Sequence, residues 1–262
     1  MKLRHRSTVG EGVDFYAQAQ RQLPYATSLA LNRTGQLILE ALVRTTSESF
    51  DRPTPYTLRA LRLRRATKEN LVAVVDYRDG AGKGISADKY LPPNVLGGGR
   101  GLKRSERALA RVGLPAQAYT VPAAGAELDA YGNMSRGQIV RLLSYLQAFG
   151  EQGYRANSTE RSRARAAKIG RSQQGYKRIN GVQYFVSRGK GTMAGNRRQP
   201  LAAGVWRKTG THGVDVQPVL LAIERPEYTR RFPFYETAEA VYTERYDAEF
   251  STALDLALAT AK

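Results

Sequence analysis

The sequence predicts an α+β fold in which a long N-terminal helix and a C-terminal helix pack on a small, mostly antiparallel sheet. Three observations predict this fold. Apolar residues recur at helical spacing near both ends of the chain, short segments between them alternate apolar and polar residues as strands do, and two long segments show neither pattern. The 262 residues suffice for one large domain, so we expect a single domain, residues 1–262, that carries large insertions.

The N-terminal helix is predicted at residues 24–50, where apolar residues such as Leu29 and Leu42 recur on one helical face. Pro24 suits the first turn of a helix, because a proline there loses no hydrogen bond. A shorter helix is expected just before it, at residues 15–22. The prolines that follow residue 52 then stop helical propagation, since each lacks an N–H group.

A β-hairpin is predicted next. Residues 57–65 and 71–78 alternate apolar and polar side chains, and the segment between them has the length of a hairpin loop. From residue 79 to residue 134 this periodicity is lost, apart from a short helix at residues 105–112. We expect residues 79–134 to form an extended arm that becomes ordered against a neighbouring molecule.

A further helix is predicted at residues 135–149, with Ser135 as its N-cap and Gln138 completing a capping box. Residues 154–178 are strongly basic and poor in apolar residues, which indicates a basic arm. The core of the domain is then expected in three parts of the chain: residues 11–78, 135–153 and 179–262.

Three strands and a last helix complete the fold, at residues 182–188, 204–209, 216–224 and 233–262. Pro218 favours an edge of the sheet or a strand start, because proline cannot donate a ladder hydrogen bond. Asp247 is a candidate cap for a second segment of the last helix.

Charge is strongly biased and unevenly distributed. The chain has 41 Lys and Arg residues against 23 Asp and Glu residues, a formal net charge of +18, which attracts polyanions or acidic protein partners. Between Arg161 and Val214 there are 13 basic residues and no acidic residue. From Glu224 to Lys262, eight acidic residues outnumber five basic ones. Such a chain suits head-to-tail packing of subunits into a ring, although a solvated basic loop and an incidental acidic helix explain the charges equally well.

If subunits pack in this way, three groups of residues are candidates for the interface. The basic group is Arg161, Arg163, Arg165, Arg171, Lys177, Arg197 and Arg198. The acidic group is Glu236, Glu239, Glu244 and Glu249. Because exposed ion pairs each contribute only ~0 to 1 kcal/mol, most of the adhesion must come from apolar burial. The residues expected to supply it lie in the extended arm: Tyr90, Leu91, Val95 and Leu96.

Residues that carry catalytic or metal chemistry are scarce. The chain has no cysteine and only two histidines, and we assign no catalytic, cofactor-binding or metal-binding residue. The glycine-rich segments 80–84 and 97–101 are interpreted as flexible loops, because neither has phosphate-loop spacing. A weaker alternative is a nuclease-like carboxylate cluster, which would use Asp76, Asp79 and Glu106 with Lys83.

Membrane and secretion signals are also missing from the pattern. No run approaches the ~18 to 20 apolar residues of a membrane span, and the first residues lack the apolar part of a secretory signal. We therefore expect no membrane partner and synthesis in the cytosol.

Nucleic acid is the alternative partner. Non-specific DNA binding would use the Arg-rich region 155–208, with arginines on the phosphates and nearby aromatic residues stacking on bases. These aromatic residues are Tyr154, Tyr176, Tyr184, Phe185 and Trp206. Tyr184 alternates with valines in a predicted strand and is more often a core residue.

Several short blocks carry a resemblance to a known family. Residues 25–34 read YATSLALNRT, residues 52–58 read RPTPYTL and residues 65–71 read RATKENL. This front part resembles minor tail proteins of tailed bacteriophages, of the tail protein Z type. Three later blocks, at residues 204–210, 218–221 and 231–235, are also similar to phage structural chains. The long middle of the chain departs from the family pattern.

The resemblance implies a non-enzymatic virion protein at the head-tail junction (neck) or in the tail, needed to complete tails and often present as a ring. The expected partners are further copies of the chain, in a hexamer or dodecamer, and other phage neck and tail proteins, with transient backbone contact to genomic DNA. The expected location is the virion, after synthesis in the cytoplasm of the bacterial host.

Overall fold

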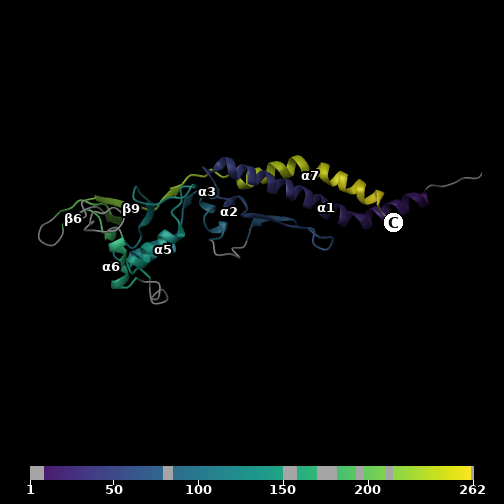
Figure 1. Ribbon diagram of the computed structural model, residues 1–262. Helices are drawn as coiled ribbons and strands as arrows, with labels where there is room; N and C mark the ends of the chain where they lie inside the picture. The colour runs from purple at the N-terminus through teal and green to yellow at the C-terminus, as the bar shows by residue number, and fades with distance from the viewer. Residues whose placement is uncertain are drawn as a thin grey trace, which may run out of the picture. The chain divides into compact units, whose positions relative to one another are not determined.

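The computed structural model describes residues 9–78, 85–149, 158–169, 182–192, 198–209 and 215–260 (Figure 1). Of residues 9–18, 166–169, 191–192 and 198–199 it describes the backbone only. The chain divides into two compact units, which we call unit 1 (Met1–Gly97 with Thr229–Lys262) and unit 2 (Gly98–Tyr228). A single domain was expected, whereas each unit has hydrophobic clusters of its own.

The predicted α+β class is confirmed. The structure has a long N-terminal helix, α1 (Val9–Ser49), a C-terminal helix, α7 (Phe234–Ala259), and small antiparallel sheets. No described helix is long and apolar enough to cross a membrane.

Unit 1 is built on an antiparallel pair of helices. Ala26 and Ala30 of α1 pack on Ala253 and Ala257 of α7, and all four side chains are fully buried. Toward the other end of the pair, Leu42 of α1 contacts the segment that leads into α7. Figure 1 shows the two helices side by side (purple and yellow). Alanine at every fourth position lets two helix backbones approach closely along this seam.

Helix α1 runs without interruption through Pro24, so the expectation of two separate helices with Pro24 in a first turn is wrong. Proline costs the helix one backbone hydrogen bond and forces a local adjustment. Packing of the next turns against α7 outweighs this cost, because most helical stability in proteins comes from such tertiary contacts. Helix α7 is likewise continuous, so Asp247 caps no second segment.

The predicted hairpin is present in unit 1. After the short helix α2 (Pro55–Leu58), strand β1 (Leu61–Arg64) pairs antiparallel with β2 (Val74–Tyr77). Leu61 is buried with Leu42 and Phe232, whereas the alternate residue Arg62 pairs with Asp76 across the hairpin. The alternation read from the sequence therefore separates a core face from a charged face.

Residues 85–134 are folded, which corrects the extended arm expected at residues 79–134; residues 79–84 lie outside the described part. In unit 1, the 3-10 helix η1 (Ala87–Lys89) and α3 (Pro92–Leu96) place Leu91 and Val95 in hydrophobic clusters. In unit 2, the segment contributes β3 (Gly98–Gly99), α4 (Arg104–Ala110) and β4 (Tyr119–Pro122). Helix α4 confirms the short helix predicted at residues 105–112. The other elements are too short to show a clear periodicity, and contacts distant in sequence hold them.

Unit 2 contains a four-stranded antiparallel sheet of order β4-β9-β8-β5. Its other strands are β5 (Gln183–Ser187), β8 (Gly204–Thr209) and β9 (Asp215–Ile223), which confirms the three predicted strands. Pro218 lies in β9, an inner strand, so its expected edge or start position is wrong. The register shifts beside it, between Val205 and Trp206, and this β-bulge accommodates the missing N–H group.

Helices α4 and α5 (Arg136–Tyr145) pack on one face of this sheet, where Leu109 and Leu142 meet Val205 and Val219. The predicted N-cap is confirmed, since the Ser135 hydroxyl accepts from the Gln138 N–H at 3.1 Å. The Gln138 side chain does not close the capping box: its Oε1 accepts from the Glu127 N–H at 3.3 Å.

Four smaller elements complete the described fold: helix α6 (Glu160–Ile169) and strands β6 (Gly191–Thr192), β7 (Arg198–Gln199) and β10 (Glu227–Tyr228). Strand β6 pairs with β7, and β3 pairs with β10. Residues 97–101, expected as a flexible loop, thus include one of these strands. In the predicted basic arm, residues 158–169 form α6 and its entry, and the remainder lies outside the described residues.

The close approach of α1 and α7 predicts a clear effect of Ala253→Leu. Leucine adds bulk to a fully packed seam, so we expect the free energy of unfolding of unit 1 to fall by about 2 kcal/mol. Urea unfolding followed by far-UV circular dichroism, to which the two long helices contribute strongly, measures the change. Ala248→Leu, at an exposed position of the same helix, is the control and should change stability by less than about 0.5 kcal/mol. Equal effects of the two variants would contradict the packing described.

Candidate subunit interface

The four acidic residues predicted to face a neighbouring subunit all lie on α7. Three of them form ion pairs within unit 1: Glu236 with Arg230, Glu244 with Arg245 and Glu249 with Arg33. Glu239 is exposed and has no ion pair among the described residues. A carboxylate already beside an arginine attracts an outside cation less strongly, so the structure singles out Glu239 from the predicted group.

The basic group is only partly within the described residues. Arg161 and Arg165 are exposed at positions i and i+4 of α6, on one face, and neither has an ion pair in the described part of the chain. Arg163 is half-buried, and its guanidinium donates to the Ser158 carbonyl oxygen at 3.3 Å. The side chains of the remaining members are not described. Arg171, Lys177 and Arg197 lie outside the described residues, and only the backbone of Arg198 is described, in β7.

The apolar group expected in the arm is corrected for two of its members. Leu91 and Val95 are buried in clusters of their own unit, so they are unable to supply contact area to a neighbour. Tyr90 is half-buried, and its hydroxyl shares a hydrogen bond with that of Thr57 at 3.1 Å. Leu96 is 72% exposed and alone in this group presents a large apolar surface.

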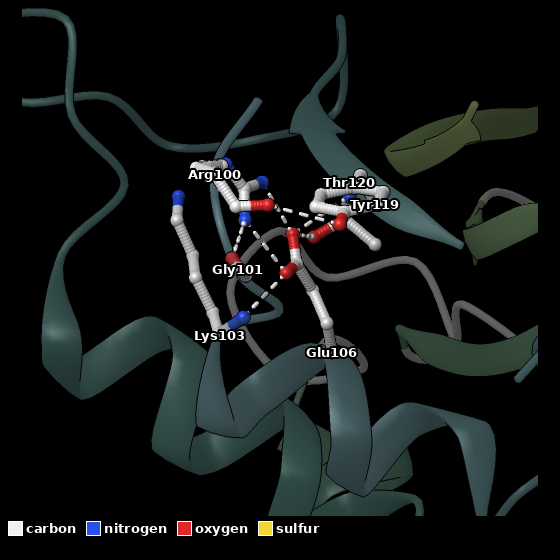
Figure 2. Close-up of polar contacts among 6 residues, drawn as sticks. All are labelled: Arg100, Gly101, Lys103, Glu106, Tyr119 and Thr120. Carbon is white, nitrogen blue, oxygen red and sulfur yellow. Dashed lines mark hydrogen bonds and ion pairs between the residues drawn. The ribbon is translucent and has the colours of Figure 1, made fainter. Parts of the chain in front are cut away.

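A buried ion pair that the sequence analysis did not predict lies at the start of α4 (Figure 2). The Glu106 side chain is fully buried and that of Arg100 is 13% exposed. The guanidinium donates to both carboxylate oxygens, at 2.6 and 2.8 Å. The backbone N–H groups of Lys103 and Thr120 also donate to Glu106, at 2.6 and 2.8 Å. The carboxylate is thus fully satisfied without water.

These contacts determine the protonation of Glu106. Burial by itself raises the pKa of the carboxyl group, but the hydrogen bonds from Arg100, Thr120 and Lys103 lower it, and the resulting pKa is about 2. The hydrogen bond to Glu106 in turn raises the pKa of the Arg100 guanidinium. Glu106 therefore stays ionised over the whole physiological range.

The cluster connects three segments of unit 2. Glu106 lies on α4, Thr120 on β4, and Arg100 in the chain before α4; the Tyr119 hydroxyl donates to the Arg100 carbonyl oxygen at 2.9 Å. The Arg100 guanidinium also lies over the Tyr119 ring, 4.8 Å from its centroid. A glutamate three residues after a helix N-cap was the available sequence signal. Its burial depends on partners that no local pattern reveals.

The geometry bears on the nuclease alternative as well. The Glu106 carboxylate is occupied by the hydrogen bonds described above, which leaves it unavailable to a metal ion. Asp76 accepts a hydrogen bond from Arg62 at 2.9 Å and pairs with Arg64 at 2.8 Å. The two acids also belong to different units. Asp79 and Lys83 lie outside the described residues. Within the described part of the chain, no group of three His, Asp or Glu side chains is placed to hold a metal ion.

The sheet face opposite the helices in unit 2 carries aromatic residues. Phe185 of β5 lies directly opposite Trp206 of β8, and Lys208 follows two residues later on the same face. Tyr184 points the other way and packs against the core cluster, as predicted. Of the remaining candidate stacking residues, Tyr154 and Tyr176 lie outside the described residues.

Comparisons of this chain with protein-family models, with curated proteins and with solved structures found no match.

Removing the buried charge at residue 106 is expected to destabilise unit 2. Glu106→Gln leaves the Arg100 guanidinium buried without its partner, so we expect a loss of about 3 kcal/mol at neutral pH. Trp206, the single tryptophan of the chain, lies in unit 2, so its fluorescence during urea unfolding reports on this unit. Glu127→Gln, which breaks the exposed pair with Arg141, is the control and should cost ~0 to 1 kcal/mol.

The same pair predicts a pH dependence. The pKa of Glu106 is about 2 in the folded chain, below its ordinary value of 4.5, so its stabilising effect is complete above pH 4.5 and is lost as the pH falls toward 2. Glu106→Gln should lack this part of the acid dependence in the same unfolding experiment, repeated between these two pH values. An identical acid profile for the two proteins would contradict the assignment.

Proposed function

We propose that this chain is a non-enzymatic structural protein of a tailed bacteriophage virion, a minor tail or tail-completion protein at the neck or in the tail. It forms a ring through head-to-tail contacts between subunits. The observation that carries the proposal is the separation of opposite charges. Arg161 and Arg165 are exposed on α6, Glu239 is exposed on α7, and none of the three has an ion pair among the described residues.

Opposite charges on different elements favour contacts between copies. When two different surfaces of one chain are complementary, the contact is heterologous, and a rotation that closes after a few copies gives a ring. The proposed ring is a hexamer or dodecamer, with other neck or tail proteins as neighbours. Its arginines contact genomic DNA only transiently, through the phosphate backbone. No cofactor, metal ion or catalytic residue is part of the proposal.

Three of the blocks that carry the resemblance to phage tail proteins include residues of packing elements, whereas the block at residues 65–71 is the largely exposed hairpin loop. Residues 25–34 lie in α1, and this segment includes Ala26 and Ala30 of the seam with α7. Residues 204–209 of the block at 204–210 and residues 218–221 fall on the two inner strands of the unit 2 sheet. Similar residues in scaffold positions support a structural role, in which shape and surface matter more than reactivity.

Electron microscopy of purified phage particles tests the location. Gold-labelled antibody against this chain should bind at the neck or tail. A label found only in the capsid interior, or none on intact and opened particles, would contradict the proposal.

Non-specific DNA binding by the region 155–208 is the second candidate. The pair of Phe185 and Trp206 beside Lys208, on the sheet face opposite α4 and α5, favours it, because aromatic rings next to a cation suit stacking on unpaired bases. This candidate makes the isolated chain, rather than an assembly, the functional form.

A titration with fluorescent single-stranded and duplex DNA at rising salt separates the two candidates. For the structural protein we expect only weak binding, with a Kd of about 10⁻⁴ to 10⁻⁶ M at physiological salt, and no effect of Trp206→Ala. DNA binding as the function predicts tight binding with a steep salt dependence, and a loss of about tenfold in affinity for single strands in Trp206→Ala. Trp206→Phe, which keeps an aromatic ring, is the matched control for stacking.

A further inference from the structure

Two exposed tyrosines flank the acid that the structure singles out. Tyr235, Glu239 and Tyr242 occupy positions i, i+4 and i+7 of α7, so they lie along one side of the helix. Tyr235 is 61% exposed and Tyr242 is 44% exposed, and Glu239 between them is also exposed. We call these three residues the α7 stripe.

The rings of the stripe are held by neighbouring aromatic residues. The Tyr242 ring stacks on Tyr246, with centroids 4.9 Å apart and an angle of 21° between the rings. The Tyr235 ring packs edge to face on Phe234 at 5.3 Å. Among the described residues, no cation lies over Tyr235 or Tyr242. Rings already oriented in this way lose little conformational entropy when a ligand covers them.

This combination suits a guanidinium group. The face of a tyrosine ring attracts a cation, and a planar guanidinium stacks on the ring while its N–H groups remain free to donate to a carboxylate nearby. A lysine ammonium can pair with the carboxylate but has no plane to stack. The stripe therefore favours arginine over lysine, and a partner with two arginines about one helical turn apart over a partner with one.

We infer that the α7 stripe binds Arg161 and Arg165 on α6 of a second copy of this chain. The two arginines are four residues apart on one face of α6, a rise of about 6 Å, and Tyr235 and Glu239 on α7 are separated by the same rise. When the two helices lie along each other, one guanidinium covers a tyrosine ring and the other pairs with Glu239. The inference rests on the proposed function, because it names the contact that closes the ring.

Charge complementarity identifies α6 as the occupant. No acidic residue lies between Arg161 and Val214 in the sequence to neutralise this segment. Five other arginines are already engaged in their own unit: Arg62 and Arg64 with Asp76, and Arg33, Arg230 and Arg245 with acids on α7. Exposed arginines outside this segment, such as Arg65, do not lie in so long a segment without acidic residues.

Charge reversal tests the contact on the full-length chain. Sedimentation velocity over a range of concentrations measures self-association. Glu239→Arg places three cations together, and the double variant Arg161→Glu, Arg165→Glu places three anions together, so each should weaken self-association by about tenfold or more. Arg65→Glu, which reverses one charge on an exposed arginine of the hairpin, is the control for charge reversal as such and should leave association unchanged.

Mixing the two reversed proteins gives the sharper result. The unchanged arginines of the Glu239→Arg protein fit the unchanged stripe of the other protein, and the new glutamates fit the new arginine at residue 239. We expect the equimolar mixture to associate more strongly than either protein alone, close to the wild-type chain. A contact between α6 and α7 within one chain would show no rescue on mixing.

The aromatic part of the stripe has its own variant. Tyr235→Ala with Tyr242→Ala should weaken association, whereas Tyr235→Phe with Tyr242→Phe should retain it, because the rings remain. Tyr131→Ala, at an exposed tyrosine of unit 2, is the control.

The outcomes separate this inference from the proposed function. Association of the wild-type chain that Glu239→Arg leaves unchanged would overturn the inference, while a ring built on another surface would remain. No rescue in the mixture, or a wild-type chain that stays monomeric up to millimolar concentration, would also overturn it. The proposed function itself fails by the labelling result described above, which does not depend on these variants.

Discussion

The pairing of α1 with α7 constrains the course of the whole chain. Because the two ends of the sequence meet along an alanine seam, everything between α3 and α7 has to leave unit 1 and return to it. The places where the chain enters and leaves unit 2 are themselves paired, as β3 with β10. Unit 2 is therefore an insertion whose two ends are fixed beside each other, a connection that lets an inserted unit fold without disturbing the pair of helices.

Much of this arrangement follows from patterns in the sequence. Helices α1, α5 and α7 and strands β5, β8 and β9 are long enough to repeat their apolar spacing, and apolar residues at these positions pack in the clusters of each unit. Local rules failed where distant contacts decide the structure. Pro24 has the properties of a helix start, yet packing on α7 carries the helix past it, and Pro218 is tolerated in an inner strand because a bulge removes the need for its N–H group. Within residues 85–134 only α4 was predicted, as the short helix at residues 105–112, because the other elements are too short to repeat an apolar spacing more than once.

The candidate site shows the same limit more sharply. Net charge located the acidic helix and the basic segment, but charge is counted along the sequence and pairing occurs in space. Glu236, Glu244 and Glu249 look alike in the sequence to Glu239, and only the positions of Arg230, Arg245 and Arg33 distinguish them. Similarly, Leu91 and Val95 are apolar residues in a segment expected to be an adhesive arm. They are core residues instead, because α3 directs them into the hydrophobic clusters of unit 1.

Acids of unit 1 and unit 2 illustrate why exposure and partners, rather than residue type, determine what a carboxylate does. The buried Glu106 carboxylate is surrounded by hydrogen-bond donors, and these contacts hold α4 and β4 together. Glu239 is exposed, with an exposed tyrosine on either side of it along the helix, so its charge is available at little desolvation cost. A single exposed ion pair is worth little, but an arginine that also covers a tyrosine ring removes apolar area from water in the same step. In the proposed contact, adhesion through the α7 stripe would therefore depend on the rings as much as on the charge, and an acidic helix without them would not be expected to hold a second copy.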